Sequence, residues 1–358
     1  MMNKIYSLIA FSIFVSGLQA QIGGNSVFQF VNLEASPRVT ALGGSAITIK
    51  DDDVSLAFHN PAAANSEIHQ SIAFNHNLHF GDITNGYLAY GHHVDKWNTT
   101  FHGGIQYIDY GNFERTDETG FVQGNFSAAE YAFTLGAGHQ LYEKLSVGAN
   151  VKFISSNFDN FSSTGLLGDA SAMYIDTAKR FTATLLIRNV GGQLTTFRGL
   201  RENVPYETQI GISKRLKHLP FRLSLIYHNL NRFDIRFDDP NSDEPSLIIG
   251  DNQQGDNELP FLDNLAQHFI INGEFLLGKR ENFRLRIGYN HFRNRESQIN
   301  NLRSFAGFAF GFGIKVNRFR IDFGRGLWQL AGGSNHFSIS TNIKEFTKKR
   351  RTAVQPQG

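Results

Sequence analysis

The chain of 358 residues contains no cysteine. Disulfides, thiolate metal sites and cysteine-linked lipid anchors are therefore excluded. After the first twenty residues there is no long apolar run, which excludes a protein that crosses a membrane with helices. The chain also lacks a large charge of one sign, because 34 Lys and Arg residues stand against 32 Asp and Glu residues. The formal charge of +2 does not indicate a nucleic-acid partner.

The two ends of the chain differ from the rest. Lys4 supplies a positive charge, residues 5–15 are apolar but too few to span a bilayer, and a small-residue cleavage site ends at Ala20. We expect residues 1–20 to be a signal peptide that is removed on export. Residues 347–358 are polar and contain four consecutive basic residues. We expect them to form a solvated periplasmic tail rather than a binding patch.

Strand-like alternation begins at about residue 71. In residues 145–153, 283–290 and 308–316, large apolar residues occupy every second position. The positions between them carry glycine, serine, asparagine, alanine, arginine or lysine. An apolar face suits contact with lipid, and a small or polar face suits a wet lumen.

The connections between these segments also alternate. Roughly fourteen segments fit into residues 69–346, each of the nine to eleven residues that a tilted strand needs to cross a bilayer. Short links alternate with longer polar links at residues 110–127, 190–205, 231–265, 292–304 and 326–335. Short periplasmic turns and long extracellular loops are typical of outer-membrane barrels. The sequence therefore predicts an all-β fold, a transmembrane antiparallel β-barrel of about fourteen strands with both ends in the periplasm.

Residues 21–68 precede the first strand and lack its alternation. Gly43 and Gly44 permit backbone conformations that are closed to other residues, and Asn60 followed by Pro61 favours a turn. The segment should therefore be compact and irregular. A barrel of fourteen strands encloses a lumen too wide for its own side chains to fill. We expect this segment to form an N-terminal plug inside the lumen or across its mouth.

The same segment resembles the N-terminal hatch of FadL-like barrels. The matching positions are Arg38, Gly43, Gly44, Asp51, Asp52, Asp53, Asn60, Pro61 and Ala62. Further matching stretches at residues 101–111, 188–196, 212–218 and 330–339 extend the resemblance over nearly the whole exported chain. With these stretches the sequence more closely resembles the PorQ-like barrels of the type IX secretion system of Bacteroidota.

The resemblance implies a FadL-like barrel in the cell outer membrane, surrounded by lipid and carrying extracellular loops. PorQ-like barrels hold an extracellular PorZ-like protein in the attachment complex, beside a PorU-like sortase and a PorV-like barrel. That complex joins secreted cargo to the cell surface. The resemblance therefore implies an anchor and not an enzyme, with no cofactor. The alternative is a FadL-like transporter of hydrophobic small molecules, in which the plug moves.

Two patterns resemble metal sites only loosely. The three acids Asp51 to Asp53 lack the later glycine and glutamate of a calcium loop, so a polar turn or a salt-bridge partner is favoured. His76 with His79, and the pair at residues 92–93, fall near predicted strand ends, where histidine is ordinary. We expect no metal site.

Ser334 and His336 are the one pair that suggests nucleophilic catalysis. Residues two apart on a strand share a face, but catalysis also needs an orienting group brought to the base, and the sequence shows none. We interpret the pair as the start of the last strand and expect no catalytic residues.

The link at residues 231–265 stands apart in length and acidity. Loops of this size are usually functional or disordered, so it is a candidate partner-docking loop, with a mobile solvated loop as the alternative. Its candidate docking residues are Asp238, Asp239, Asp243, Glu244, Asp251, Asp256 and Glu258. Four basic residues are predicted to point into the lumen and to pair with the acids of the plug: Arg284, Arg286, Lys315 and Arg320.

Overall fold

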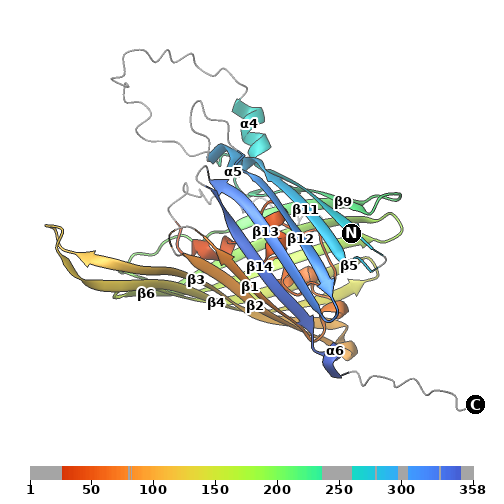
Figure 1. Cartoon of the computed structure of the whole chain (residues 1–358), viewed down its shortest axis with the longest axis horizontal. Coiled ribbons are helices and arrows are strands. Elements are labelled where there is room, and N and C mark those ends of the chain that lie inside the picture. The colour runs from red at the N-terminus through yellow and green to blue at the C-terminus, as the bar shows by residue number, and fades with distance from the viewer. Residues whose placement is uncertain are drawn as a thin grey trace, which may run out of the picture.

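The computed structural model describes residues 26–79, 81, 83–235, 260–278, 280–296, 305–329 and 332–347. Its strands form one closed antiparallel barrel in chain order, with β1 paired to β14 (Figure 1). Closure leaves no unpaired sheet edge around the barrel, as a hydrocarbon environment requires. The prediction of a barrel with fourteen strands is confirmed.

The strands share an antiparallel register with both neighbours. Their bounds are β1 Ser71–Leu78, β2 Thr84–Val94, β3 Thr99–Thr116, β4 Val122–Tyr142, β5 Leu145–Phe158, β6 Phe161–Asp176, β7 Phe181–Thr195, β8 Glu207–Arg215, β9 Phe221–Tyr227, β10 Phe269–Leu277, β11 Phe283–Asn290, β12 Phe308–Val316, β13 Phe319–Gln329 and β14 Gly332–Asn342.

The helices are all short. Those before the barrel are η2 Gln29–Asn32, α2 Pro37–Ala41, α3 Leu56–His59, η3 Pro61–Ala63 and η4 Ser66–Ile68, and those within or after it are η5 Asp95–Trp97, α4 Pro260–Gln267, α5 His291–Glu296 and α6 Lys344–Thr347. Among the described residues, no helix has the length and apolar character needed to cross a membrane.

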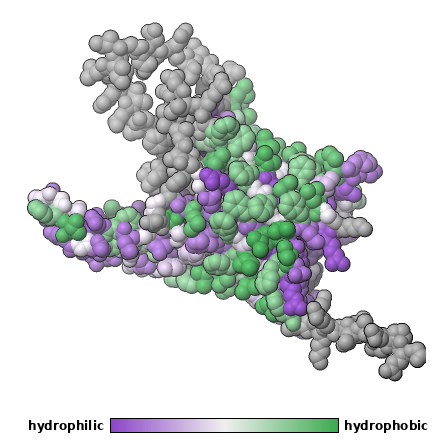
Figure 2. All heavy atoms as spheres, viewed as in Figure 1, coloured by the Kyte–Doolittle hydropathy of each residue, from purple (hydrophilic) through white to green (hydrophobic). Residues whose placement is uncertain are grey.

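The two faces of the barrel wall differ as the alternation predicts. In β12, Phe308, Phe310 and Phe312 are exposed on the outside, whereas Ala309 and Gly311 point inward. Apolar residues of this kind cover much of the visible outer wall (Figure 2). Such an exterior is stable in lipid and would be an aggregation hazard in water. The chain is therefore a β-barrel of the outer-membrane type.

Strands β3 to β7 continue well past the rest of the barrel (Figure 1). The pairing of β2 with β3 ends at Asp109, yet β3 continues to Thr116 and pairs with β4 there. The prediction that residues 110–127 form a loop is therefore wrong for most of their length. A bulge between Asp109 and Asn112 shifts the register, and Asn112 pairs with Ser127 beyond it. The residues there no longer show the apolar alternation that marks a lipid-facing strand.

Two other predicted loops are also shorter than expected. The link at residues 190–205 is partly strand, because β7 reaches Thr195 and pairs with β6 up to Thr164. The link at residues 326–335 is replaced by a hairpin in which Gln329 pairs with Gly332. The expected signal peptide, the acidic docking residues between positions 238 and 258, and the basic tail from residue 348 lie outside the described residues.

Candidate functional site

Residues 26–70, here called the inner segment, lie inside the barrel (Figure 1). A β-carbon added at Gly148 of β5 would lie 2.3 Å from Pro61, and one at Gly324 of β13 would lie 2.1 Å from Pro37. These strands lie on different sides of the barrel, and glycine on the inner face lets the segment approach each of them. The lumen is therefore filled by backbone contact as well as by side chains.

The glycine pair makes the first sharp turn of the inner segment. Helix α2 begins after Ser36, whose hydroxyl accepts a hydrogen bond from the Val39 amide at 3.4 Å. Gly43 and Gly44 have φ angles of 78° and 96°, which a side chain would strain. The carbonyl of Gly43 then accepts a hydrogen bond from Asn290 of β11 at 3.1 Å. The turn is thus attached to the barrel wall.

The Asn60-Pro61-Ala62 stretch makes a second attachment. Asn60 caps helix η3 by accepting a hydrogen bond from the Ala62 amide, and its own amide group donates to the Ile47 carbonyl at 2.6 Å. The Ala62 amide also donates to Ser171 at 2.9 Å, and the Ala62 carbonyl accepts from Ser146 at 3.1 Å. Two neighbouring strands, β5 and β6, therefore hold this turn.

Arg38 lies at the centre of an ion-pair network between the inner segment and the wall. Its side chain is 1% exposed and donates two hydrogen bonds to Glu274 of β10, at 3.0 and 2.9 Å. It also pairs with Asp51 at 2.7 Å and with Asp53 at 3.4 Å. Burial alone would raise the pKa of Asp51, but Arg38 and Arg284 hold this pKa well below its ordinary value.

Glu274 extends this network along the wall. It pairs with Arg286 of β11 at 2.9 Å and lies 3.5 Å from Arg222 of β9. Arg286 in turn donates to Asp322 of β13 at 2.6 Å. Strands β9, β10, β11 and β13 are thereby connected through buried or mostly buried charges, so the network is sensitive to the loss of any one member.

The predicted pairing of the lumenal basic residues is half correct. Arg284 pairs with Asp51 and Asp52, and Arg320 pairs with Asp52 at 2.7 Å, so both contact acids of the inner segment. For Arg286 the prediction is wrong, because the directly opposite residue on β10 is Glu274. For Lys315 it is also wrong, because this residue lies at the end of β12 and pairs with Glu345 of α6 at 3.2 Å.

A second buried group of charges lies against helix α3. Lys152 of β5 is fully buried and pairs with Asp169 of β6 at 2.8 Å, while its ammonium group lies 4.8 Å from the centre of the Phe58 ring. Asn150 donates to the Phe58 carbonyl at 3.0 Å. These contacts fix the middle of the inner segment. The sequence predicted the pairing of Arg284 and Arg320 with the acids of the inner segment, but not the part of that network around Glu274 and not the second group. A glutamate within the apolar strand at residues 269–277 was a visible signal for the former.

His336 and His79 lie beside neutral polar side chains. His336 is buried and its Nδ1 lies 3.0 Å from the Thr40 hydroxyl, and no hydrogen bond joins it to Ser334 within the described residues. His79 lies beside Asn77 and Asn85. No group of three potential metal ligands occurs in the part of the chain that the structure describes.

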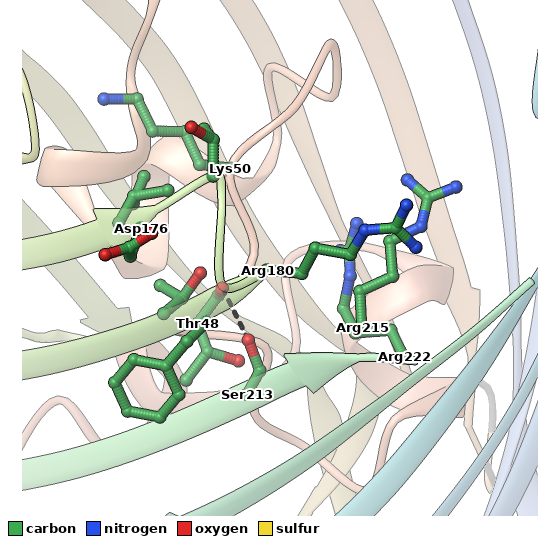
Figure 3. Close-up of a pocket in the computed structure, with 11 residues that line it drawn as sticks. Thr48, Lys50, Asp176, Arg180, Ser213, Arg215 and Arg222 are labelled. Atoms are coloured by element: carbon green, nitrogen blue, oxygen red, sulfur yellow. Dashed lines mark hydrogen bonds between the residues drawn. The ribbon is translucent and has the colours of Figure 1, made fainter. Parts of the chain in front are cut away.

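A polar pocket of about 500 Å³ opens between the inner segment and strands β6 to β9 (Figure 3). It lies at the end of the barrel that carries the short turns, because Asp176, Thr177 and Arg180, at the β6–β7 turn, contribute to its wall. Its polar lining residues are Thr48, Lys50, Asp176, Thr177, Arg180, Thr182, Ser213, Arg215 and Arg222. Burial lowers the pKa of Lys50 to about 8. No local sequence motif indicates this pocket, because its residues come from five separate segments.

No family model and no curated protein matches the chain. Among solved structures, a FadL homologue of Pseudomonas aeruginosa aligns with a TM-score of 0.47 and 12% identity, over 86% of this chain and 98% of that one. CdiB from Acinetobacter baumannii aligns with a TM-score of 0.34 and 11% identity, over 76% of this chain and 59% of that one. A porin variant of Rh. blastica aligns with a TM-score of 0.29 and 8% identity, over 76% and 97%.

Proposed function

We propose that this barrel is a non-enzymatic outer-membrane component of the type IX secretion system. In this proposal it anchors an extracellular PorZ-like protein of the attachment complex, in which a PorU-like sortase and a PorV-like barrel act on secreted cargo. The resemblance of the sequence to PorQ-like barrels supplies the identity of the partners. The observation that carries the role of anchor is the buried pairing of Arg38 with Glu274.

Separating this buried pair would cost free energy. Opening the lumen would separate Arg38 from Glu274. Each side chain is only 1% exposed, so the separated charges would have little contact with water. Leaving a buried charge without its partner costs about 3–5 kcal/mol. Lys152 and Asp169 beside helix α3 add a second such contact region. A lumen held closed in this way suits a scaffold better than a conduit.

The extension of strands β3 to β7 supports a role at the surface. It lies at the end of the barrel opposite α6 and the short turns (Figure 1). Hydrogen bonds along paired strands make it stiffer than a loop, and a rigid platform loses little entropy when a partner binds. The acidic candidates between Asp238 and Glu258 belong to a link on the same end of the barrel. Together they would offer a partner a firm surface and a charged loop.

The test is affinity isolation of the tagged full-length chain from native outer membranes, followed by identification of the proteins recovered with it. We expect the PorZ-like protein to be recovered. Deletion of residues 242–258 should leave a heat-modifiable, folded barrel and reduce recovery of that partner. Deletion of residues 199–200, in the exposed link between β7 and β8, serves as a control for shortening a surface connection outside the acidic loop and the strand extension. Equal recovery with all three chains would refute a docking role for the acidic loop.

The alternative function, transport of a hydrophobic small molecule, makes an opposite prediction. A transporter should take up a labelled fatty acid into vesicles, and cross-linking the inner segment to the wall should abolish uptake. The anchor should show no uptake above protein-free vesicles, with or without the cross-link. Uptake that depends on a free inner segment would replace the anchor proposal with the transporter.

A further inference from the structure

The pocket beside the inner segment has an excess of positive charge. Lys50, Arg180, Arg215 and Arg222 line it, against the single carboxylate of Asp176. That carboxylate is already occupied, because it accepts hydrogen bonds from the Lys144 ammonium group at 2.9 Å and from a backbone amide of its own turn. The pocket therefore presents four cations with little negative charge of its own.

Two of these cations, Lys50 and Arg180, donate their hydrogen bonds to neutral acceptors. Lys50 donates to the neutral amide oxygen of Gln140 at 3.0 Å. Arg180 donates to the backbone carbonyls of Leu216 and Lys217 at 3.0 and 3.2 Å. Within the described residues, neither side chain forms an ion pair with a carboxylate. Neutral acceptors orient a cation without cancelling its charge.

The other two arginines are only partly compensated. Arg215 pairs with Glu281 at 2.7 Å. Arg222 lies 3.5 Å from Glu274, but this carboxylate already accepts shorter hydrogen bonds from two other arginines, and Arg222 Nη1 has no hydrogen-bond partner. Arg222 thus connects the pocket to the buried network, and its Nη1 can still donate a hydrogen bond to a ligand.

Three guanidinium groups gather on one side of the pocket. Figure 3 shows those of Arg180, Arg215 and Arg222 close to one another, with Lys50 extending to the other side. Like charges in a partly enclosed site repel one another, and a bound anion would offset that repulsion. The planar donor fork of arginine matches the oxygens of a phosphate group, which accepts several such bonds at once.

We propose that this pocket binds a phosphate oxyanion. The ligand is either a free phosphate group from the periplasm or the phosphate of an anionic lipid headgroup, and both present the same oxygens. The inference goes beyond the anchor function and does not depend on it. It rests on the cavity, on the four cations that line it, and on the absence of a carboxylate ion pair at Lys50 and Arg180 within the described residues.

The pocket is organised before a ligand arrives. Arg180 has a left-handed backbone with φ of 53° and is held against the β8–β9 turn by its two carbonyl contacts. The buried Thr48 hydroxyl has no hydrogen-bond partner within the described residues, and it is available as a neutral donor. Side chains that are already positioned lose little entropy on binding.

The first test is calorimetric titration of the full-length chain in neutral detergent at low salt, with inorganic phosphate as the ligand. We expect saturable binding that weakens at least about tenfold in the double variant Arg180→Gln with Arg215→Gln, since the loss of one charged hydrogen bond already weakens binding by about a factor of ten. Lys179→Gln, which removes an adjacent exposed charge outside the pocket, should bind within about twofold of the original chain. Absent binding, or equal binding by both variants, would overturn the proposal.

A second measurement uses the unaltered chain and does not require the variants to fold. Phenylglyoxal modifies accessible arginines, and mass spectrometry reports each site. Phosphate should protect Arg180 and Arg215 but not Arg115. The Arg115 guanidinium pairs with Asp159 on the distant extension of strands β3 to β7. Protection that is equal at all three sites, or absent at the first two, would overturn the proposal.

Labelling in two nanodisc membranes of different lipid composition distinguishes a free phosphate group from a lipid headgroup. The chain is reconstituted into nanodiscs of phosphatidylcholine with or without phosphatidylglycerol, and each is labelled both without and with added inorganic phosphate. Protection of Arg180 only with phosphatidylglycerol identifies the lipid headgroup. Protection only after inorganic phosphate is added identifies a free phosphate group. Absence of protection in every arm would refute phosphate binding.

Discussion

Neutralising Glu274 tests the network that holds the inner segment in place. The substitution Glu274→Gln keeps the shape of the side chain but removes the charge that faces Arg38 at 2.9 Å, Arg286 at 2.9 Å and Arg222 at 3.5 Å. Breaking a buried pair by removing one partner costs about 3–5 kcal/mol. Glutamine retains one acceptor oxygen, so we expect a loss of about 3 kcal/mol, which is roughly a hundredfold in the unfolding equilibrium.

The assay is a urea titration of the barrel in lipid vesicles, with the folded fraction measured by the heat-modifiable band and cleavage of the inner segment measured by trypsin. Glu143→Gln, in the exposed β4–β5 turn, is the matched control and should change stability by less than about 0.5 kcal/mol. We expect Glu274→Gln to expose the inner segment to trypsin at a lower urea concentration. An identical midpoint for both variants would refute the claim that this network holds the segment.

A double-mutant cycle isolates the contact itself. If Arg38 and Glu274 stabilise the fold through each other, the double variant Arg38→Gln with Glu274→Gln should lose less stability than the two single losses added together. The difference should exceed about 0.5 kcal/mol, the usual scatter for sites that do not touch. Strict additivity would mean that each residue acts through other neighbours, and the role assigned to their pairing would be wrong.

Three further predictions concern other contacts of the inner segment. Gly288→Ala should displace the segment and increase its cleavage, because the new β-carbon would lie 2.3 Å from Leu42, whereas Gly192→Ala has open space and should be neutral. Lys152→Met should cost about 3 kcal/mol in the urea titration by leaving Asp169 without its cation. Because burial lowers the pKa of Lys50 to about 8, its reaction with acetic anhydride should rise through a midpoint near pH 8. A midpoint above pH 10 would refute this.

The same pKa shift has a consequence for stability. The ordinary pKa of Lys50 is 10.5, so between about pH 8 and pH 10.5 the unfolded chain binds the proton that the folded chain has released. The free energy of unfolding therefore increases as pH rises through this window, which means that the folded chain becomes more stable. Below about pH 8 both states hold the proton, and Lys50 causes no such increase. Phosphate bound in the pocket would favour the charged ammonium group and move the midpoint upward.

The barrel was predictable from the sequence because lipid and lumen impose opposite demands on alternate residues. In residues 308–316 the phenylalanines mark the lipid side, and Gly311 marks a place where the inner segment approaches. The same signal explains the main error. Beyond Asp109 the strands leave the barrel, their outer face carries Asn112 and Glu114, and the apolar alternation disappears although the strand continues.

The site was less predictable, because its members are brought together only by closure of the barrel. Arg38 and Glu274 are 236 residues apart, and neither lies in a local sequence motif from which its partner could be predicted. The inward arginines could be placed on a face by alternation, but their partners could not. Arg286 pairs with the residue directly opposite it on the next strand, and such register is decided by turn lengths that the sequence leaves uncertain by a few residues.

The two turns of the inner segment bear on whether it can move. A hinge absorbs changes in backbone angles without losing its own contacts. Gly43 is different, because its positive φ brings its carbonyl to Asn290, and Asn272 binds the preceding carbonyl of Leu42 at 3.1 Å. Rotation at this glycine would break both hydrogen bonds to the wall. The turn at Ala62 is bound in the same way by strands β5 and β6. Both turns therefore attach the segment to the barrel, and movement would require release of the whole network rather than bending at either turn.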